Sequence, residues 1–185
     1  MYHRPTSRRL FLKASLLTSL AFLHPGIALA SLPMEKRASG RLNLYNIHTG
    51  EKINTIYRDP DGQYNAQGIN ELTWLLRCHY TNQPHPIDLK TLDYLDLVNT
   101  RLGNSNEIHV ISGYRSPEYN NYLISHGHKV AKHSLHMEGR AIDIRIPGTT
   151  LSTLQRTALS LRLGGVGYYP SEDFVHIDSG AFRRW

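Results

Sequence analysis

Alternating hydrophobic and polar positions mark the first regular elements of the chain. From Arg41 to Tyr57, two alternating runs, 42–47 and 52–57, flank the segment Thr49-Gly50-Glu51. Alternation with a period of two places every second side chain on one face of a strand, and a glycine between two such runs supplies a tight turn. The pattern therefore predicts a β-hairpin with Gly50 in its turn.

Helical spacing follows the hairpin. Leucines three and four positions apart predict a helix over 69–80, and Asp88 is the expected start of a second helix that runs to Leu102. The remaining predicted elements are strands at 108–112, 141–146, 168–169 and 174–178, and helices at 116–125 and 151–163. Helices interspersed with short strands and one hairpin favour an α+β domain with a mainly antiparallel sheet flanked by helices.

Composition narrows the class of protein. The 185 residues are 40% hydrophobic and 19% charged, which is ordinary for a globular protein and excludes a wholly disordered chain. No window reaches the roughly 18–20 uninterrupted apolar residues that a membrane-spanning helix needs, so we expect no membrane span in the mature chain. The single cysteine, Cys78, excludes an intramolecular disulfide and a cysteine-rich zinc site, and we expect it to pack in the core within the helix 69–80.

Residues 1–30 have the parts of a cleavable export signal. They combine a basic start at Arg8-Arg9, a short apolar stretch over 14–23 and the small-x-small ending Ala28-Leu29-Ala30. Adjacent arginines followed by Phe-Leu-Lys resemble a twin-arginine signal, which implies export after folding. The sequence therefore predicts a periplasmic protein.

The remainder divides into a flexible lead-in over 31–40 and one domain over 41–185. Cleavage after Ala30 removes four basic residues and no acidic ones, which leaves 17 Lys and Arg against 15 Asp and Glu. A nucleic-acid-binding protein needs a concentrated basic face, so we expect no nucleic-acid partner.

In each of two predicted strands, polar side chains lie on the face opposite the aliphatic ones. In Ala141–Ile146 the isoleucines occupy one face and Asp143 the other, and in Phe174–Asp178 the aliphatic residues lie opposite His176. If both aliphatic faces pack on the core, Asp143 and His176 emerge from the same side of the sheet. His136 can fold back over that side because Gly139 permits a sharp turn.

His136, Asp143 and His176 would then form a set of two imidazoles and one carboxylate. Such a set suits Zn²⁺ and leaves a fourth coordination position open for water. Parity alone leaves the alternative that two histidines and an acid share a polar face by chance.

The spacing of these residues resembles a known signature. Ser134-x-His136-x-x-Gly139-x-Ala141-x-Asp143, followed by Phe174-Val175-His176-Ile177-Asp178, is similar to the zinc-ligand motifs of the D-Ala-D-Ala peptidase/Hedgehog-type metallopeptidases. Within them the chain resembles the murein endopeptidase K group, and the similarity covers about 41–185. The segments that carry this narrower likeness are Ser112–Pro117, Gly139–Asp143 and Gly165–Pro170.

The resemblance implies a Hedgehog/DD-peptidase-like fold and a zinc peptidase, with one Zn²⁺ per chain, that hydrolyses peptide cross-links of peptidoglycan. In the family an arginine upstream of the first ligand faces the substrate carbonyl or carboxylate, which here corresponds to Arg115. The alternative for Arg115 is that it only pins the strand-to-helix corner by hydrogen bonds. His133 would add hydrogen-bond donors near the site, and Tyr114, Tyr168 and Tyr169 either line the cleft or pack in the core.

Two carboxylates are candidates for the general base. Family members place an acidic residue three positions before the last histidine, which corresponds to Asp173 if the strand begins only at Phe174. Asp178 has the parity of His176 but lies two residues along the strand, roughly 6.5 Å away, and could instead orient that histidine. A further residue or a group of the substrate is the third possibility.

Two other functions stay open from the sequence. A D,D- or L,D-carboxypeptidase would trim the ends of stem peptides, and a non-catalytic domain would bind peptidoglycan without hydrolysis. Serine chemistry is weakly supported, because the chain has neither Ser-x-x-Lys nor Gly-x-Ser-x-Gly. The sequence does not distinguish cross-links between two diaminopimelate residues from those between D-Ala and diaminopimelate, and it does not indicate the oligomeric state or regulation.

Overall fold

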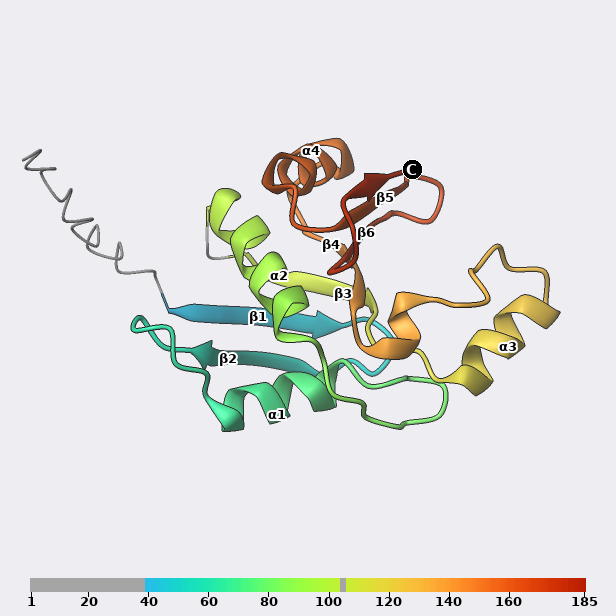
Figure 1. Cartoon of the computed structure of the whole chain (residues 1–185), viewed down its shortest axis with the longest axis horizontal. Coiled ribbons are helices and arrows are strands. Elements are labelled where there is room, and N and C mark those ends of the chain that lie inside the picture. The colour runs from blue at the N-terminus through green and yellow to red at the C-terminus, as the bar shows by residue number, and fades with distance from the viewer. Residues whose placement is uncertain (1–38, 104–105) are drawn as a thin grey trace, which may run out of the picture. The chain divides into compact units, whose positions relative to one another are not determined.

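The structure is a computed structural model that describes residues 39–103 and 106–185 (Figure 1). The predicted export signal over 1–30 and most of the predicted lead-in lie outside the described residues. Within them, no helix combines the length and the apolar character that crossing a membrane requires.

The described chain alternates strands with helices as the hydrophobic pattern predicts. The strands are β1 (Gly40–Asn46), β2 (Lys52–Arg58), β3 (Ile108–Ser112), β4 (Ala141–Arg145), β5 (Gly165–Tyr169), β6 (Phe174–Asp178) and β7 (Arg183–Arg184). The helices are α1 (Ala66–Leu75), α2 (Leu89–Arg101), α3 (Pro117–Ser125), α4 (Leu151–Leu161) and a short 3-10 helix, η1 (Leu135–Glu138). The α+β class is therefore confirmed.

The predicted mainly antiparallel sheet needs correction, because the sheet is mixed. Its seven strands follow the order β2-β1-β3-β4-β6-β5-β7, and β1 pairs parallel with β3, as β5 does with β7. Parallel neighbours require a long crossover, which β2, α1 and α2 provide between β1 and β3. Local sequence patterns reveal hairpins but not pairings between distant segments, so both parallel pairs were missed.

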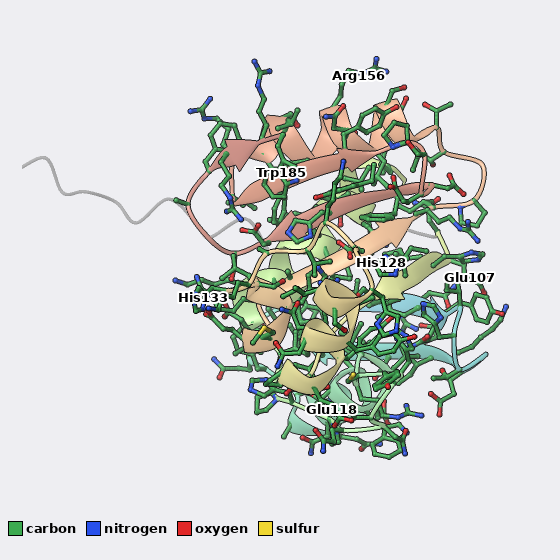
Figure 2. All side chains as sticks on the ribbon, turned by 90° about the vertical axis from the view of Figure 1, so that its right-hand side faces the viewer. Glu107, Glu118, His128, His133, Arg156 and Trp185 are labelled. Carbon is green, nitrogen blue, oxygen red and sulfur yellow. The ribbon has the colours of Figure 1, made fainter. Side chains whose placement is uncertain are left out.

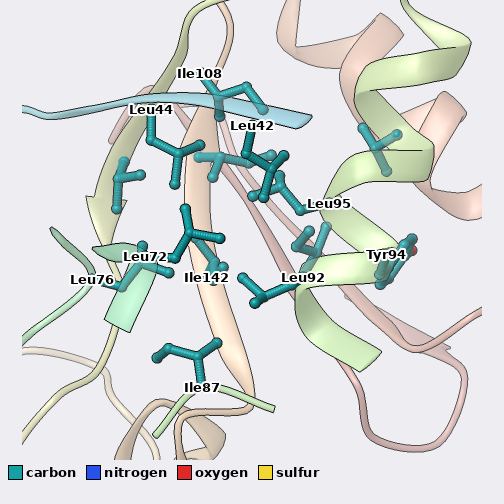
Figure 3. Close-up of a cluster of buried hydrophobic side chains, with 14 of the residues drawn as sticks. Leu42, Leu44, Leu72, Leu76, Ile87, Leu92, Tyr94, Leu95, Ile108 and Ile142 are labelled. Carbon is teal, nitrogen blue, oxygen red and sulfur yellow. The ribbon is translucent and has the colours of Figure 1, made fainter. Parts of the chain in front are cut away.

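One face of the sheet packs against helices. Leu42 and Ile142 from the sheet are fully buried and belong to the same apolar cluster as Leu72 from α1 and Leu92 and Leu95 from α2 (Figure 3). Burial of such side chains stabilises a fold by about 1.5–3 kcal/mol each. The opposite face of β4 and β6 is thereby left free for polar side chains.

Side-chain caps set the helix starts. Asp88 and Ser116 accept hydrogen bonds from the first turns of α2 and α3, as their positions in the sequence predict. The first helix begins earlier than expected because Asn65 caps it, and it ends at Leu75. Cys78 therefore lies beyond the helix, where its backbone pairs with Gln83, but it is buried in the core as predicted.

We predict that Leu92→Ala lowers the free energy of unfolding by about 3 kcal/mol, since it removes a fully buried side chain and leaves a cavity. Urea denaturation of the metal-free protein measures the change. Leu163→Ala is the matched control, because Leu163 is half exposed, and it should change the value by less than about 0.5 kcal/mol. Equal losses for both variants would contradict the placement of the core.

Candidate metal centre

The pairing of β4 with β6 brings two of the predicted site residues together. Asp143 lies directly opposite His176 in the antiparallel register, and Ile142 lies opposite Ile177 on the buried face. Because side chains alternate along a strand, the aliphatic pair faces the helices while Asp143 and His176 share the other face. The predicted parity of both strands is confirmed.

His136, the third predicted site residue, reaches the sheet through a tight turn. Ser134 caps η1, which carries His136, and Gly139 ends it in the left-handed conformation with φ of 65°. A Cβ at Gly139 would overlap the carbonyl oxygen of Pro86, so only glycine fits there. The Nδ1 atom of His136 donates a hydrogen bond of 2.8 Å to the carbonyl oxygen of Gly113, which fixes the ring.

Three ligand-type atoms meet at one buried point. His136 Nε2 lies 3.2 Å from Asp143 Oδ1 and 3.1 Å from His176 Nδ1, and the last two atoms are 2.7 Å apart. The other nitrogen of each imidazole is committed as a donor, to Gly113 and to Asp178. In their neutral forms, both histidines therefore direct a lone pair at the Asp143 carboxylate, and only a cation between the three atoms relieves that arrangement.

Without a metal, a proton is the cation that the side chains hold. Burial lowers the pKa of His136. Burial also acts to lower the pKa of His176, but its hydrogen bonds to Asp143 and Asp178 outweigh that effect and raise the pKa to about 9. Burial raises the pKa of Asp143, yet the neighbouring histidines overcome it and hold the pKa well below its usual range. His136, Asp143 and His176, called the trio below, therefore form a buried cation site in which His176 is the residue that holds the proton.

The same geometry fits a divalent metal ion. Tetrahedral ligands about 2.0–2.1 Å from Zn²⁺ lie about 3.3 Å from one another, close to the separations of the three atoms here. His136, Asp143 and His176 are also the one group of potential metal ligands that the described residues bring this close together.

Asp178 stands behind His176 rather than beside the trio. Its carboxylate is fully buried and accepts a 3.0 Å hydrogen bond from His176 Nε2. It also accepts two hydrogen bonds from Arg183, at 2.7 and 3.0 Å. A carboxylate in this position fixes the tautomer and orientation of a ligating histidine, which is the second of the two roles predicted for Asp178.

Arg115 lies where the sequence predicts it, at the corner between β3 and α3. It is 8% exposed, and its nearest anionic partner is Asp143, at 3.7 Å. Its Nη2 atom lies 3.5 Å from Ser112 Oγ, while its Nε atom has no hydrogen-bond partner in the described part of the chain. The guanidinium borders the same cavity as the trio, so it has donors to offer a ligand.

The structure does not bring Asp173 to the trio. The strand begins at Phe174, as the predicted role of base requires, but Asp173 forms a 2.6 Å ion pair with Arg145. It borders a different cavity, together with Arg145 and His109. Asp173 adopts a φ of 59°, and neither this conformation nor the partner is visible in a strand pattern.

Some of the other side chains around the trio were predicted from the sequence, and others were not. His133 and Tyr169 line the cavity, whereas Tyr114 packs in the core. Lys129 and Trp185 also line it and were not identified from the sequence. Figure 2 labels His133 and Trp185 on the side of the molecule that carries α3. No motif marks Trp185, because its place depends on the pairing of β7.

The fold and the three side chains define an α+β protein with a buried cluster of His136, Asp143 and His176 that could hold a metal ion. A family model described as "Peptidoglycan L,D-endopeptidase MepK" matches residues 35–185, and the chain belongs to this family of peptidases. The resemblance seen in the sequence motifs is thereby confirmed.

Curated relatives agree with the family model. The peptidoglycan L,D-endopeptidases MepK of Escherichia coli (strain K12) and Shigella flexneri are both 42% identical to this chain over 144 residues, which cover 78% of it and 79% of each relative. The probable peptidoglycan L,D-endopeptidase MepK of Haemophilus influenzae is 40% identical over 145 residues, which cover 78% of this chain and 77% of the relative.

We predict that apparent zinc affinity rises about tenfold per pH unit from pH 6 to pH 8. Metal binding must displace the proton of His176, whose pKa of about 9 keeps it bound throughout this range. Competition with a chromophoric chelator measures the affinity. A histidine with an ordinary pKa near 6.5 would instead give a plateau above about pH 7, and such a plateau would contradict the coupling within the trio.

Proposed function

We propose that this chain is a zinc-dependent peptidoglycan endopeptidase that hydrolyses peptide cross-links during growth or remodelling of the cell wall. The convergence of His136, Asp143 and His176 in a buried cluster carries the proposal. Membership of a peptidase family whose curated relatives are named peptidoglycan L,D-endopeptidases supports it.

His136, Asp143 and His176 would hold the ion through Nε2, Oδ1 and Nδ1. Two neutral imidazoles and one carboxylate leave net positive charge on Zn²⁺, which is typical of catalytic rather than purely structural sites. When bound, the ion would polarise the scissile carbonyl and lower the pKa of a water molecule towards about 7.

Arg115 is the proposed electrostatic stabiliser. Its guanidinium borders the cavity and is held only by long contacts to Asp143 and Ser112, so donors remain for a substrate oxygen. A fixed cation aimed at the oxygen that gains negative charge lowers the barrier of acyl transfer by several kcal/mol.

Three residues are candidates for the base that accepts a proton from the attacking water molecule. Asp178 is saturated by Arg183, by His176 and by two backbone amides, which favours an orienting role. Asp173 would have to leave its ion pair with Arg145 to act as a base. His133 lines the cavity of the trio and is a further candidate.

The proposed bond is the one between two diaminopimelate residues. In that cross-link the carbonyl belongs to an L centre and the nitrogen to a D centre, whereas the bond between D-Ala and diaminopimelate joins two D centres. The curated relatives are named L,D-endopeptidases, which favours the first. The mature chain would meet this substrate in the periplasm, after export directed by residues 1–30.

We predict that the mature protein converts diaminopimelate-linked dimers from isolated sacculi into monomers, that a chelator stops the reaction and that Zn²⁺ restores it. Separation of the products by chromatography measures the conversion, with D-Ala-linked dimers as the matched control substrate. Shortened monomers would instead indicate a carboxypeptidase, and binding without any product would indicate a non-catalytic domain. Either result contradicts the proposed endopeptidase.

We predict that Arg115→Ala lowers kcat about 100-fold or more at unchanged zinc content, because it removes the charge that faces the reacting oxygen. Asp173→Ala, assayed at equal zinc content, should stay within about threefold of the wild type, since its carboxylate is paired with Arg145. If Arg115→Ala loses zinc in proportion to its loss of activity, the role of Arg115 is purely structural. A 100-fold loss in Asp173→Ala would restore Asp173 as the base.

A further inference from the structure

The last residues of the chain form an edge strand beside the metal centre. In β7, Arg183 and Arg184 pair in parallel with Gly165 and Val166 of β5. The pairing continues into Trp185, whose N–H donates to the carbonyl oxygen of Val166 at 3.2 Å and whose backbone oxygen accepts from the N–H of Tyr168 at 3.1 Å. The backbone of the C-terminal residue is therefore fixed.

Arg183 reaches behind the centre to Asp178. Its Nη1 and Nη2 atoms lie 3.0 and 2.7 Å from the two carboxylate oxygens, a bidentate pairing with a carboxylate that is 0% exposed. The same carboxylate accepts the hydrogen bond of His176 Nε2. An unbroken chain of contacts thus runs from Arg183 through Asp178 to a proposed metal ligand.

Glycines make room for residues 183–185, which we call the C-terminal tail. A Cβ at Gly165 would lie 2.6 Å from Arg183 Nη1, and a Cβ at Gly180 would lie 3.0 Å from it. A Cβ at Gly167 would lie 2.7 Å from the Trp185 ring. Gly165 and Gly167 are two residues apart on β5 and therefore face the same side, so the glycine-rich strand is shaped to receive Arg183 and Trp185.

Trp185 forms part of the cavity wall. Its ring centroid lies 5.3 Å from that of His176, and its Nε1 atom donates a 2.6 Å hydrogen bond to the hydroxyl of Tyr169. The guanidinium of Arg183 lies 4.9 Å from the centroid of the Trp185 ring, and the Trp185 side chain borders the cavity that contains His136, Asp143 and His176. The residue is nevertheless 47% exposed, so a fixed aromatic surface remains for a ligand.

We propose that the C-terminal tail has two roles in the site. Arg183 positions His176 through Asp178, and Trp185 contacts the aliphatic part of the substrate. The second role rests on the proposed function. In a diaminopimelate cross-link, the extended apolar group beside the scissile bond is the unbranched methylene chain of that residue. Packing of methylene groups on an indole ring is favourable through dispersion and loss of exposed apolar surface.

The role of Arg183 is tested by zinc affinity, which requires no substrate. Arg183→Gln should weaken zinc binding about tenfold or more, since partners that orient a ligating histidine typically contribute 10–100-fold. Arg184→Gln is the matched control, because Arg184 is exposed and makes no ion pair within the described chain, and it should stay within twofold. Arg183→Lys keeps the charge without the bidentate geometry and should fall between the two.

Equal zinc affinity in the Arg183→Gln and Arg184→Gln proteins overturns the positioning role. If Arg183→Gln does not fold, Arg183→Lys decides the question, and wild-type affinity in that variant likewise overturns the role.

The role of Trp185 is tested by binding of diaminopimelate-linked dimers to the zinc-free protein. Trp185→Ala should raise Kd about tenfold, and Trp185→Phe should recover part of the loss. Trp74→Ala is the matched control, since Trp74 is similarly exposed but stacks on Arg77 away from the cavity.

An unchanged Kd in Trp185→Ala overturns the contact while leaving the proposed function intact. Failure of the wild-type protein both to bind and to cleave the dimers overturns the proposed function and the substrate contact together, and leaves the zinc result for Arg183 standing.

Discussion

The candidate centre depends on one register, the antiparallel pairing of β4 with β6. That pairing sets Asp143 opposite His176 and, one position along, Ile142 opposite Ile177. A slip by one residue would turn the polar pair into the core and the isoleucines out to solvent, so burial of the aliphatic face holds the polar face in place. Hydrophobic packing against α2 and α4 thus fixes the geometry of the chemistry on the other side of the sheet.

That geometry concentrates acceptor atoms where water is scarce. Holding the Asp143 carboxylate next to two imidazole lone pairs is unfavourable unless a cation lies among them. The surroundings are built for this cation: Gly113 and Asp178 fix the two ring orientations, and Arg183 compensates the charge of Asp178. The proposed metal ligands are therefore supported by contacts that reach β7.

The sequence predicts those features of the site that follow from local periodicity. The alternation in two strands places Asp143 and His176 on one face, and Gly139 accounts for the return of His136. Features that depend on distant contacts were not predictable in this way. The ion pair between Asp173 and Arg145 joins the turn before β6 to the end of β4. The parallel pairings of β1 with β3 and of β5 with β7 join segments without a hairpin signal. The start of α1 does have a local signal, because asparagine favours the N-cap position that Asn65 occupies.

His136 Nε2, Asp143 Oδ1 and His176 Nδ1 are proposed to bind one divalent ion. Anomalous diffraction at the zinc absorption edge, from crystals grown with Zn²⁺, tests this proposal most directly. We expect a single strong peak within about 2.3 Å of His136 Nε2, Asp143 Oδ1 and His176 Nδ1. A folded protein with no peak at that position, in which the three side chains remain hydrogen-bonded to one another, would contradict it.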